Sequence, residues 1–311
     1  MPKHNRIAVY GHRGWASSEI VGHLIASGAP ITVLYRPGSD ISNVRHKAKT
    51  IEVDVADHDA LVAALQDIDI VLSLVGHEGV TRQRAFVDAI PKTNVTLFVP
   101  SDLAARYDAL GLRIPVNSAK DEIESAAKKA NIPTTVVLTG NFAEFALNTM
   151  AMGVDYQGNQ LTYVGASAEK ELNLCTRRYV AAAYASIFAF TPVEDLQNRA
   201  IGLSELKLTG HELSLALEKR HGKLPEIIVR SVQTVQDEVE GCLRSGSRFS
   251  LAWYCRLIWG TGQQAEMVGN DIWEVENFPK ASLEDLIIKG ELKQYRDIPM
   301  EVNDYFRQTF K

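Results

Sequence analysis

The sequence predicts an α/β protein, with a Rossmann-type doubly wound parallel sheet and a smaller α+β region toward the C-terminus. Three observations predict this fold class. Short apolar, β-branched runs alternate with helical stretches over the first half of the chain. These runs are continuously apolar, which is typical of strands that helices bury on both faces. The connections are short, so the order along the chain favours right-handed βαβ units.

Six strands and four helices are expected in this half. The apolar runs place the strands at residues 6–10, 31–35, 50–55, 68–75, 95–99 and 134–138. Helical periodicity places the helices at residues 18–27, 57–65, 82–90 and 121–130. Asp57, at the start of the second helix, has a side chain that can cap it.

The alternation ends at about Gly140. Helical stretches at 179–190 and 211–220 then mix with short strand-like pieces at 161–164 and 227–229. Aromatic side chains gather here, at Trp253, Tyr254, Trp259, Trp273 and Phe278. We therefore expect a Rossmann-type domain over residues 1–150. A smaller substrate-binding region over 151–311 should pack on it, and the chain can cross back to the Rossmann core.

Composition excludes several classes of function. The net charge of −5 argues against nucleic acid as the main partner. The three cysteines lie far apart, without zinc-ligand spacing, so no metal site is expected. The longest apolar run, 179–190, is too short to cross a bilayer, and no secretory segment precedes the first strand. We expect a cytoplasmic protein that does not enter a membrane.

A glycine turn follows the first strand, with Gly11, Gly14 and Ser17 in GxxGxxS spacing. The first glycine permits a tight turn, the second lets backbone approach a pyrophosphate, and the small third residue lets helix and strand pack closely. The helix start then offers free N–H groups to phosphate. The position between a strand and a helix favours a dinucleotide site over an ordinary turn.

Arg36, directly after the second strand, indicates the cofactor. NAD sites usually carry an acidic residue there, which accepts a hydrogen bond from the ribose 2′-hydroxyl. A guanidinium instead meets a 2′-phosphate bidentately, so NADP(H) is expected. Arg13 and Arg45 can add positive charge, and Asp40 can offset it. The alternative is that Arg36 is a solvated surface arginine.

Several segments together resemble a known family. They are GHRGWAS after the first strand, YRPGS after the second, LSLVGH at the end of the fourth, FVPSD after the fifth, and AKDEIESAAKKANIPTTVVLTGNF. Their order and spacing over Arg6 to Leu147 resemble the NmrA-like and isoflavone-reductase-like family of atypical short-chain dehydrogenases. Ser17 stands where that family usually has a third glycine.

The resemblance implies an NADPH-binding Rossmann domain with a small C-terminal substrate region. Some family members reduce phenylpropanoids or fungal secondary metabolites, whereas the NmrA regulators bind the dinucleotide without doing chemistry. The expected cofactor-binding residues are Gly11, Arg13, Gly14, Trp15, Ser17, Arg36, Asp54, Val75, Gly76, Ser101, Lys120, Asn141 and Phe142. Phe142 can pack beside a nicotinamide or substrate ring, and plain core packing is the alternative.

The acid/base candidate is Lys120. None of the ten tyrosines has a lysine four residues later, so the Tyr-x-x-x-Lys pair of other short-chain dehydrogenases is absent. With Ser118 as the cap, Lys120 would lie in the first helical turn, at the edge of the apolar stripe formed by Ile123 and Ala127. Burial and the helix dipole would both lower its pKa. In the reductases of the family, a lysine at the matching place is the proposed acid/base. The alternative is a solvated lysine paired with Glu124.

Three functions follow as hypotheses. The first is an NADPH-dependent reductase of an aromatic or polyketide-like small molecule of secondary metabolism, with Lys120 as acid/base. The second is a redox-sensing, NADP-binding regulator without catalysis. The third is a non-redox isomerase or cyclase on the same fold. The aromatic C-terminal half favours a hydrophobic small-molecule substrate, and a homodimer is one assembly that the sequence allows.

Overall fold

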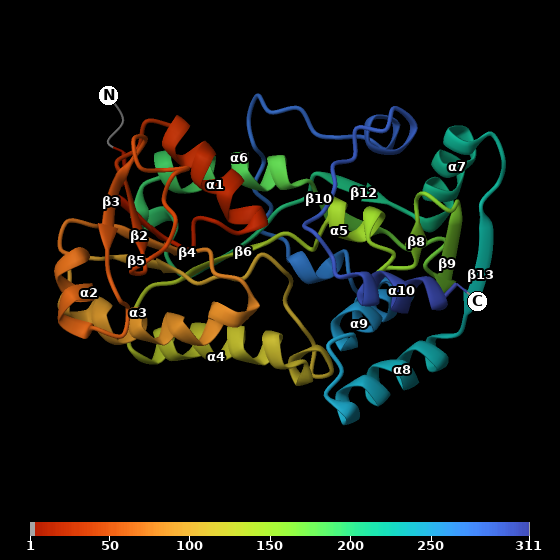
Figure 1. Cartoon of the computed structure of the whole chain (residues 1–311), viewed down its shortest axis with the longest axis horizontal. Helices are drawn as coiled ribbons and strands as arrows, with labels where there is room; N and C mark the ends of the chain where they lie inside the picture. Colours follow the sequence, from red (N-terminus) through yellow and green to blue (C-terminus); the bar gives the residue numbers. More distant parts are fainter. Residues whose placement is uncertain (1–3, 311) are drawn as a thin grey trace. The chain divides into compact units, whose positions relative to one another are not determined.

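A five-stranded parallel sheet lies at the centre of the N-terminal part of the computed structural model, which describes residues 4–310 (Figure 1). The strand order is β3-β2-β1-β4-β5, which reverses between β1 and β4 as in a doubly wound fold. The predicted fold class is confirmed. The strands are β1 (Ile7–Tyr10), β2 (Ile31–Tyr35), β3 (Lys49–Glu52), β4 (Ile70–Ser73) and β5 (Leu97–Val99).

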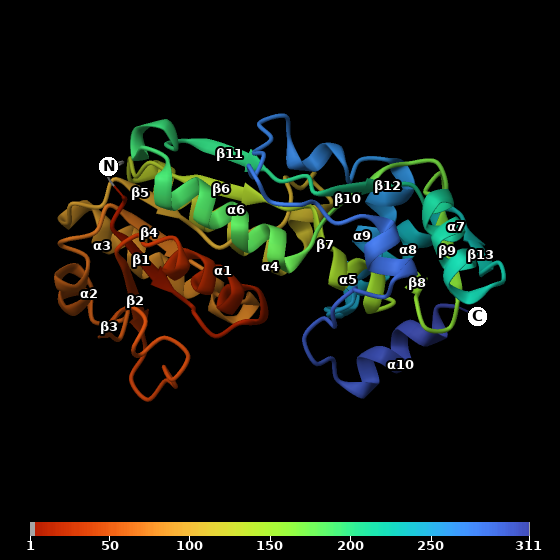
Figure 2. The same ribbon diagram turned by 90° about the horizontal axis from the view of Figure 1, so that it is seen from above.

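Helices cover both faces of this sheet, which is why β1, β4 and β5 are fully buried, whereas the edge strand β3 has exposed Lys49 and Glu52 at its ends. Side chains of α2, α3 and α4 share one buried core with the strands, whereas α1 and most of α6 lie side by side on the opposite face (Figures 1 and 2). The bounds are α1 (Trp15–Ala26), α2 (His58–Ala64), α3 (Arg84–Ala89), α4 (Pro115–Lys129) and α6 (Arg177–Phe190). Asp57 caps α2 as expected, because its side chain accepts the N–H of Ala60 at 3.0 Å.

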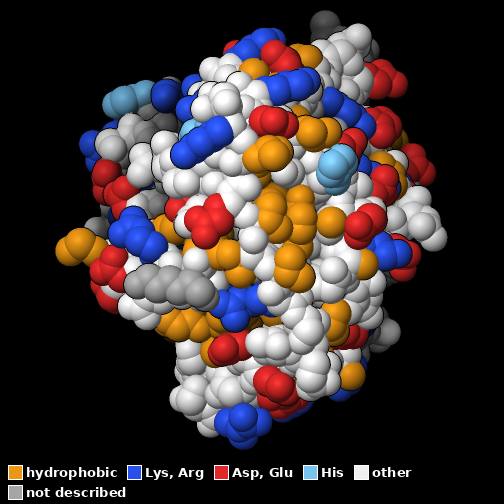
Figure 3. Space-filling view, turned by 90° about the vertical axis from the view of Figure 1, so that its right-hand side faces the viewer, with side chains coloured by type: hydrophobic (Ala, Val, Ile, Leu, Met, Phe, Trp, Pro, Cys, Tyr) orange, Lys and Arg blue, Asp and Glu red, His pale blue; other side chains and the backbone are white. Residues whose placement is uncertain are grey.

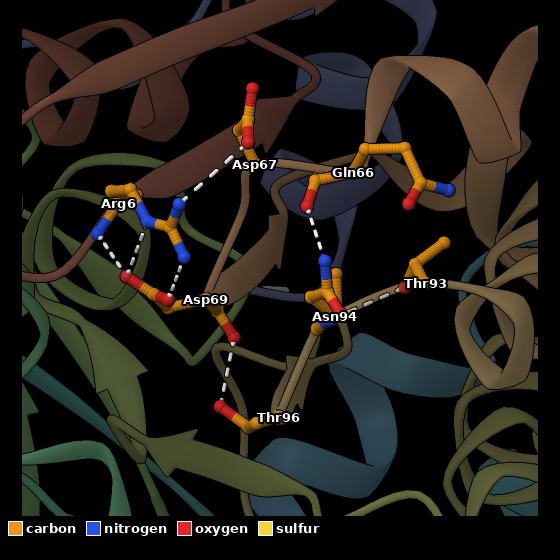
Figure 4. Close-up of polar contacts among 8 residues, drawn as sticks. Arg6, Gln66, Asp67, Asp69, Thr93, Asn94 and Thr96 are labelled. Carbon is orange, nitrogen blue, oxygen red and sulfur yellow. Dashed lines mark hydrogen bonds and ion pairs between the residues drawn. The ribbon is translucent and has the colours of Figure 1, made fainter.

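At the amino edge of the sheet, the guanidinium of Arg6 pairs with the carboxylate of Asp69 (Figure 4). Asp69 Oδ1 accepts Arg6 Nη2 at 2.6 Å, and Asp69 Oδ2 accepts Arg6 Nε at 3.1 Å and the Arg6 backbone N–H at 2.8 Å. Asp67 lies 3.9 Å from Arg6 Nη1. These contacts therefore link the start of β1 to the segment before β4, and they neutralise the positive charge of Arg6.

The expected sixth strand does not join the five-stranded ladder. β6 (Thr135–Leu138) pairs with β11 (Arg199–Gly202) in a separate two-stranded sheet. The two residues before β6 contact β5, through the hydrogen bond from Phe98 N–H to Pro133 O and a bridge between Phe98 and Thr134. A buried apolar run predicts a strand, and it does not say which strand lies beside it.

α4 begins six residues before the expected start, at Pro115. Proline suits the first position of a helix, where its missing N–H is not needed. Ser118 therefore lies inside α4 and does not cap it, and its hydroxyl donates to Glu122 at 3.2 Å. The placement of Lys120 in the first helical turn is also wrong, since it is the sixth residue of α4.

The rest of the chain builds two small mixed sheets, with strand orders β12-β10-β7 and β13-β9-β8. Their bounds are β7 (Asn141–Phe142), β8 (Val154–Asp155), β9 (Gln160–Val164), β10 (Leu172–Cys175), β12 (Leu206–Leu208) and β13 (Glu226–Arg230). The helices are α5 (Ala143–Asn148), α7 (Gly210–His221), α8 (Val232–Ser245), α9 (Ser250–Thr261) and α10 (Met300–Gln308). Side chains from α5, α7, α9 and the strands form the main core here.

The chain divides into two compact units, and the backbone passes between them several times. Unit 1 is the chain up to Leu103, with Pro115–Val137 and Val180–Ile201. Unit 2 is Ala104–Ile114, Leu138–Tyr179 and the chain from Gly202 onward. Within residues 4–310, no helix has the length and apolar character that a bilayer crossing needs.

Candidate cofactor site and buried lysine

A pocket of about 560 Å³ opens in unit 1 at the carboxyl ends of β1, β2 and β3. Three arginines line it. Arg13 comes from the loop after β1, Arg36 follows β2, and Arg82 comes from the 3₁₀ helix His77–Gln83 after β4. The other lining residues are Pro37, Gly38, Ser39, Asp54, Val55 and Ala56. Ligands bind at this edge in doubly wound sheets.

The pocket is electropositive. Among residues 4–310, no acidic side chain forms an ion pair with Arg13, Arg36 or Arg82. Asp54 is the acidic residue in the lining, and its Oδ1 accepts the backbone N–H of Ala56 at 3.0 Å. Guanidinium groups that converge without carboxylate partners suit a dianion such as a phosphate, which they can bind bidentately.

Asp40 does not neutralise Arg36. Its Oδ1 accepts the backbone N–H of Ser42 at 2.8 Å, and bonds from Ser42 lower the pKa of this exposed carboxyl. The backbone carbonyl of Asp40 lies 3.1 Å from Nε2 of His12, which is buried. Burial lowers the pKa of His12, so the neutral ring ties the glycine loop to the loop after β2. Arg45 is not among the lining residues.

The two glycines of the turn have different structural roles. Gly11 has a φ of +98°, and a Cβ there would lie 2.8 Å from backbone atoms of Leu74. The fold itself therefore requires glycine at this position. Gly14 is extended and is the N-cap of α1, without a side-chain cap. A Cβ on Gly14 would meet only the Ser17 side chain, with Oγ at 2.9 Å, so the fold alone does not demand glycine here.

The other predicted residues of unit 1 lie in the turn or along the same edge of the sheet. Trp15 is the first residue of α1 and is half-buried, whereas Ser17 is buried and its hydroxyl donates to Gly14 O at 3.3 Å. Ser101, after β5, donates its hydroxyl to Val75 O at 2.7 Å. Val75 is half-buried and Gly76 is exposed. This hydrogen bond links the loop after β4 to the end of the neighbouring strand β5.

Lys120 is largely shielded from solvent, with a side chain 14% exposed. Its Nζ donates to the backbone carbonyl of Asp102 and lies 3.7 Å from Asp102 Oδ1. Burial lowers the pKa of Lys120, and the Asp102 carboxylate opposes that shift. The alternative of a solvated lysine paired with Glu124 is wrong, because Glu124 pairs with Lys128 at 2.6 Å.

Three residues of this edge were not identified from the sequence as site residues. Arg82 is distant from Arg36 along the chain, and only the fold brings both into one pocket. Asp102 belongs to the FVPSD segment, but its pairing with Lys120 has no sequence signal. Tyr184 on α6 is fully buried, and among the described residues its hydroxyl has no hydrogen-bond partner. Burial and the Asp102 charge raise the pKa of Tyr184.

Asn141 and Phe142 belong to unit 2, so they are not grouped with the pocket. Asn141 Oδ1 accepts Gln264 Nε2 at 2.9 Å, and Asn141 Nδ2 lies 3.6 Å from Sγ of Cys255. Phe142 is half-buried in β7, where it pairs in register with Cys175. Their role beside a cofactor stays a prediction.

Comparison with known proteins identifies the family. A family model described as the NmrA-like family matches residues 3–238, which is more than half of the chain. The chain therefore belongs to the NmrA-like family, and it is distantly related to the isoflavone-reductase-like enzymes.

Curated relatives match the chain over about half of their length. Bifunctional pinoresinol-lariciresinol reductase 1 of Thuja plicata is 30% identical over 170 residues, covering 49% of this chain and 54% of the relative. Phenylcoumaran benzylic ether reductase Pyrc5 of Pyrus communis is 31% identical over 163 residues, covering 48% and 53%.

Solved structures match over nearly the whole chain at low identity. A crystal structure of isoflavone reductase has a TM-score of 0.73 at 20% identity, with coverage of 99% of this chain and 100% of the other. The leucoanthocyanidin reductase–NADPH complex of Vitis vinifera has a TM-score of 0.71 at 16% identity, with coverage of 98% and 99%. These likenesses establish a shared fold.

Proposed function

We propose that this protein is an NADPH-dependent reductase of an aromatic or polyketide-like small molecule, with Lys120 as the acid/base. The observation that carries the proposal is the pocket of three unpaired arginines at the carboxyl edge of a doubly wound sheet. Relatives that are named as reductases, and a similar fold solved with NADPH, support it.

The residues of unit 1 fit NADPH in three ways. Arg13, Arg36 and Arg82 offer guanidinium donors for the 2′-phosphate. The uncapped N-terminus of α1 offers N–H groups for the pyrophosphate. Gly14 leaves that approach open, since only the Ser17 side chain would meet a Cβ there. When bound, the cofactor supplies the hydride.

Lys120 would hold and move the proton. Two of its three N–H hydrogens can point toward the carbonyl and carboxylate of Asp102, which leaves one for a substrate oxygen. Its burial lowers its pKa toward the range useful in proton transfer, while Asp102 keeps the protonated form accessible. A proton from Nζ and the hydride would together reduce a polarised double bond.

A substrate screen tests the proposal. Purified protein is mixed with NADPH and a panel of aromatic enones and related metabolites, and NADPH oxidation is followed by absorbance. We expect turnover with at least one compound, and slower turnover when NADH replaces NADPH at the same subsaturating concentration. If no compound is turned over, while the NADP-loaded protein captures a protein that the cofactor-free protein does not, the chain is a regulator instead.

A further inference from the structure

Gln83, the last residue of the 3₁₀ helix His77–Gln83, carries a polar side chain that is fully buried. Charged side chains lie spread over the molecular surface, as the face drawn in Figure 3 shows. A polar group in the interior must replace its contacts with water by hydrogen bonds within the protein. Gln83 Nε2 donates to Val80 O at 3.1 Å, and Gln83 Oε1 accepts the backbone N–H of Ser101 at 2.7 Å. This amide therefore links the 3₁₀ helix to the loop after β5.

Ser101 is held at two points. Its backbone N–H donates to Gln83, and its hydroxyl donates to Val75 O at 2.7 Å. Both partners belong to the segment after β4, whereas Ser101 follows β5. Ser101 is buried, so water does not readily replace the Gln83 oxygen as the acceptor of its N–H. The two hydrogen bonds thus fix the chain directly before Asp102.

The backbone directly after Asp102 is strained. Leu103 has a φ of +52°, in the left-handed region that is unfavourable for a residue with a Cβ atom. A residue persists in that conformation only where the surrounding contacts hold the chain in place. The anchor on Ser101, two residues earlier, is such a contact, so the position of Asp102 depends on it.

Asp102 is the charged group that acts on Lys120. Its carbonyl accepts Lys120 Nζ and its carboxylate lies 3.7 Å away, and both contacts oppose the lowering of the lysine pKa by burial. Tyr184 on α6 is also close enough for the Asp102 charge to raise its pKa. On α4, and on α3 and the 3₁₀ helix packed against it, other charged or titratable side chains are exposed or paired elsewhere: Asp121, Glu122, Glu124 with Lys128, Arg84 with Asp88, His77, Glu78 and Arg82.

We propose that Gln83 is a positioning residue, whose amide keeps Asp102 against the Lys120 amine. The inference rests on the proposed role of Lys120 as acid/base. Gln83 acts in two steps, through its bond to the Ser101 N–H and then through the contacts of Asp102 with Nζ. Without the anchor, Asp102 spends less time beside the amine, and burial acts on the amine with less opposition. The pKa of Lys120 then falls, and the protonated donor is lost at a lower pH.

The test measures the protonation of Lys120 and needs no substrate. The full chain is labelled with a small amount of acetic anhydride over a pH series. Mass spectrometry of the peptide that contains Lys120 gives the pH at which its amine becomes half reactive. In Gln83→Met, which keeps the side-chain length and removes the amide, this pH should fall by about 0.5–1 unit. Lys128, an exposed lysine of the same helix, is the internal reference and should not shift.

Gln264→Met is the matched control. Gln264 is also fully buried, and its Oε1 accepts a backbone N–H, that of Asn173, at 2.7 Å. It belongs to unit 2, so this variant loses the same kind of hydrogen bond and should leave the labelling of Lys120 unchanged. Gln83→Glu keeps an acceptor for Ser101 and should label at the native pH or above. Circular dichroism checks folding, and Gln83→Asn, whose shorter side chain withdraws the oxygen, replaces Gln83→Met if that variant is unfolded.

A double variant distinguishes positioning from general loosening. Asp102→Asn alone should lower the labelling pH of Lys120 at least as far, and adding Gln83→Met should lower it no further. The proposal is overturned by an unchanged or raised labelling pH in folded Gln83→Met, by an equal shift in Gln264→Met, or by additive shifts in the double variant. If these shifts occur as expected in a protein that turns over no compound, the reductase function fails while the positioning of Lys120 by Gln83 stands.

Discussion

At the amino edge of the five-stranded sheet, Arg6 donates two guanidinium hydrogen bonds to Asp69. At the carboxyl edge three arginines line one pocket, and among residues 4–310 none of them forms an ion pair, although Asp40 lies near enough for the charge of Arg13 to lower its pKa. The first arrangement satisfies its own charge and binds two segments of the chain together. The second brings three positive charges close together, and their mutual repulsion does not stabilise the folded state. The difference supports the proposal that the carboxyl edge binds an anionic cofactor.

The largest expected effect concerns Lys120, whose side chain is only 14% exposed. Lys120→Ala should lower turnover by roughly 10²–10⁴, the range for a positioned proton-transfer group. Lys120→Arg should not rescue it, since a guanidinium stays protonated. NADPH affinity, measured by calorimetry, should change by less than about threefold in both variants. If turnover survives in Lys120→Ala, the pairing with Asp102 is structural.

The next effect distinguishes the two glycines of the turn. Gly14→Val should weaken NADPH binding by about 10²-fold, because a branched side chain blocks the approach to the start of α1. The melting temperature should change little, since the backbone of Gly14 is extended. Gly22→Val, in the same helix with open space around its Cα, is the control and should bind normally. Native affinity in Gly14→Val would place the phosphates elsewhere.

Arg82 tests whether the third arginine belongs to the site. Arg82→Ala should weaken NADPH by about 5- to 30-fold and leave NADH affinity unchanged, as loss of one charge-assisted contact to the 2′-phosphate predicts. Isothermal titration with both cofactors measures this. An equal loss of affinity for both cofactors would mean that Arg82 contacts a part of the cofactor that NADH and NADPH share.

The smallest effect belongs to the amino edge. Arg6→Ala removes a partly exposed, bidentate pair, so we expect a fall in Tm of about 1–2 °C and no change in NADPH affinity. Differential scanning calorimetry and titration of the same sample measure both quantities. A loss of NADPH affinity in this variant would show that the amino edge also contributes to cofactor binding, which contradicts the distinction between the two edges.

The sequence predicted those features that depend on local pattern. Apolar runs located β1, β2, β4 and β5, and the run at 50–55 overlapped the edge strand β3, which covers 49–52. Gly11, Gly14 and Arg36 were identified from their places after strands. Features that depend on spatial convergence could not be predicted. Arg82 reaches the pocket through a 3₁₀ helix that has no clear periodicity. Tyr184 looks like an ordinary core residue of an apolar helix.

Two errors came from competing local signals. Ser118 resembles a helix cap, yet Pro115 had already begun α4, so the dipole argument for Lys120 fails and burial alone lowers its pKa. The run 134–138 is as apolar as the other strands, but its hydrogen bonds go to β11, from a distant part of the chain. The existence of this helix and this strand was predicted correctly, whereas the start of the helix and the partner of the strand were not.

The most direct test of the carboxyl-edge pocket compares NADPH with NADH on the unmodified protein by isothermal titration calorimetry. The two cofactors differ only in the 2′-phosphate. If Arg13, Arg36 and Arg82 hold that group, NADPH should bind about 5- to 150-fold more tightly, and Arg36→Asp should remove most of the difference. Equal affinity of the unmodified protein for both cofactors would contradict the assignment of the pocket.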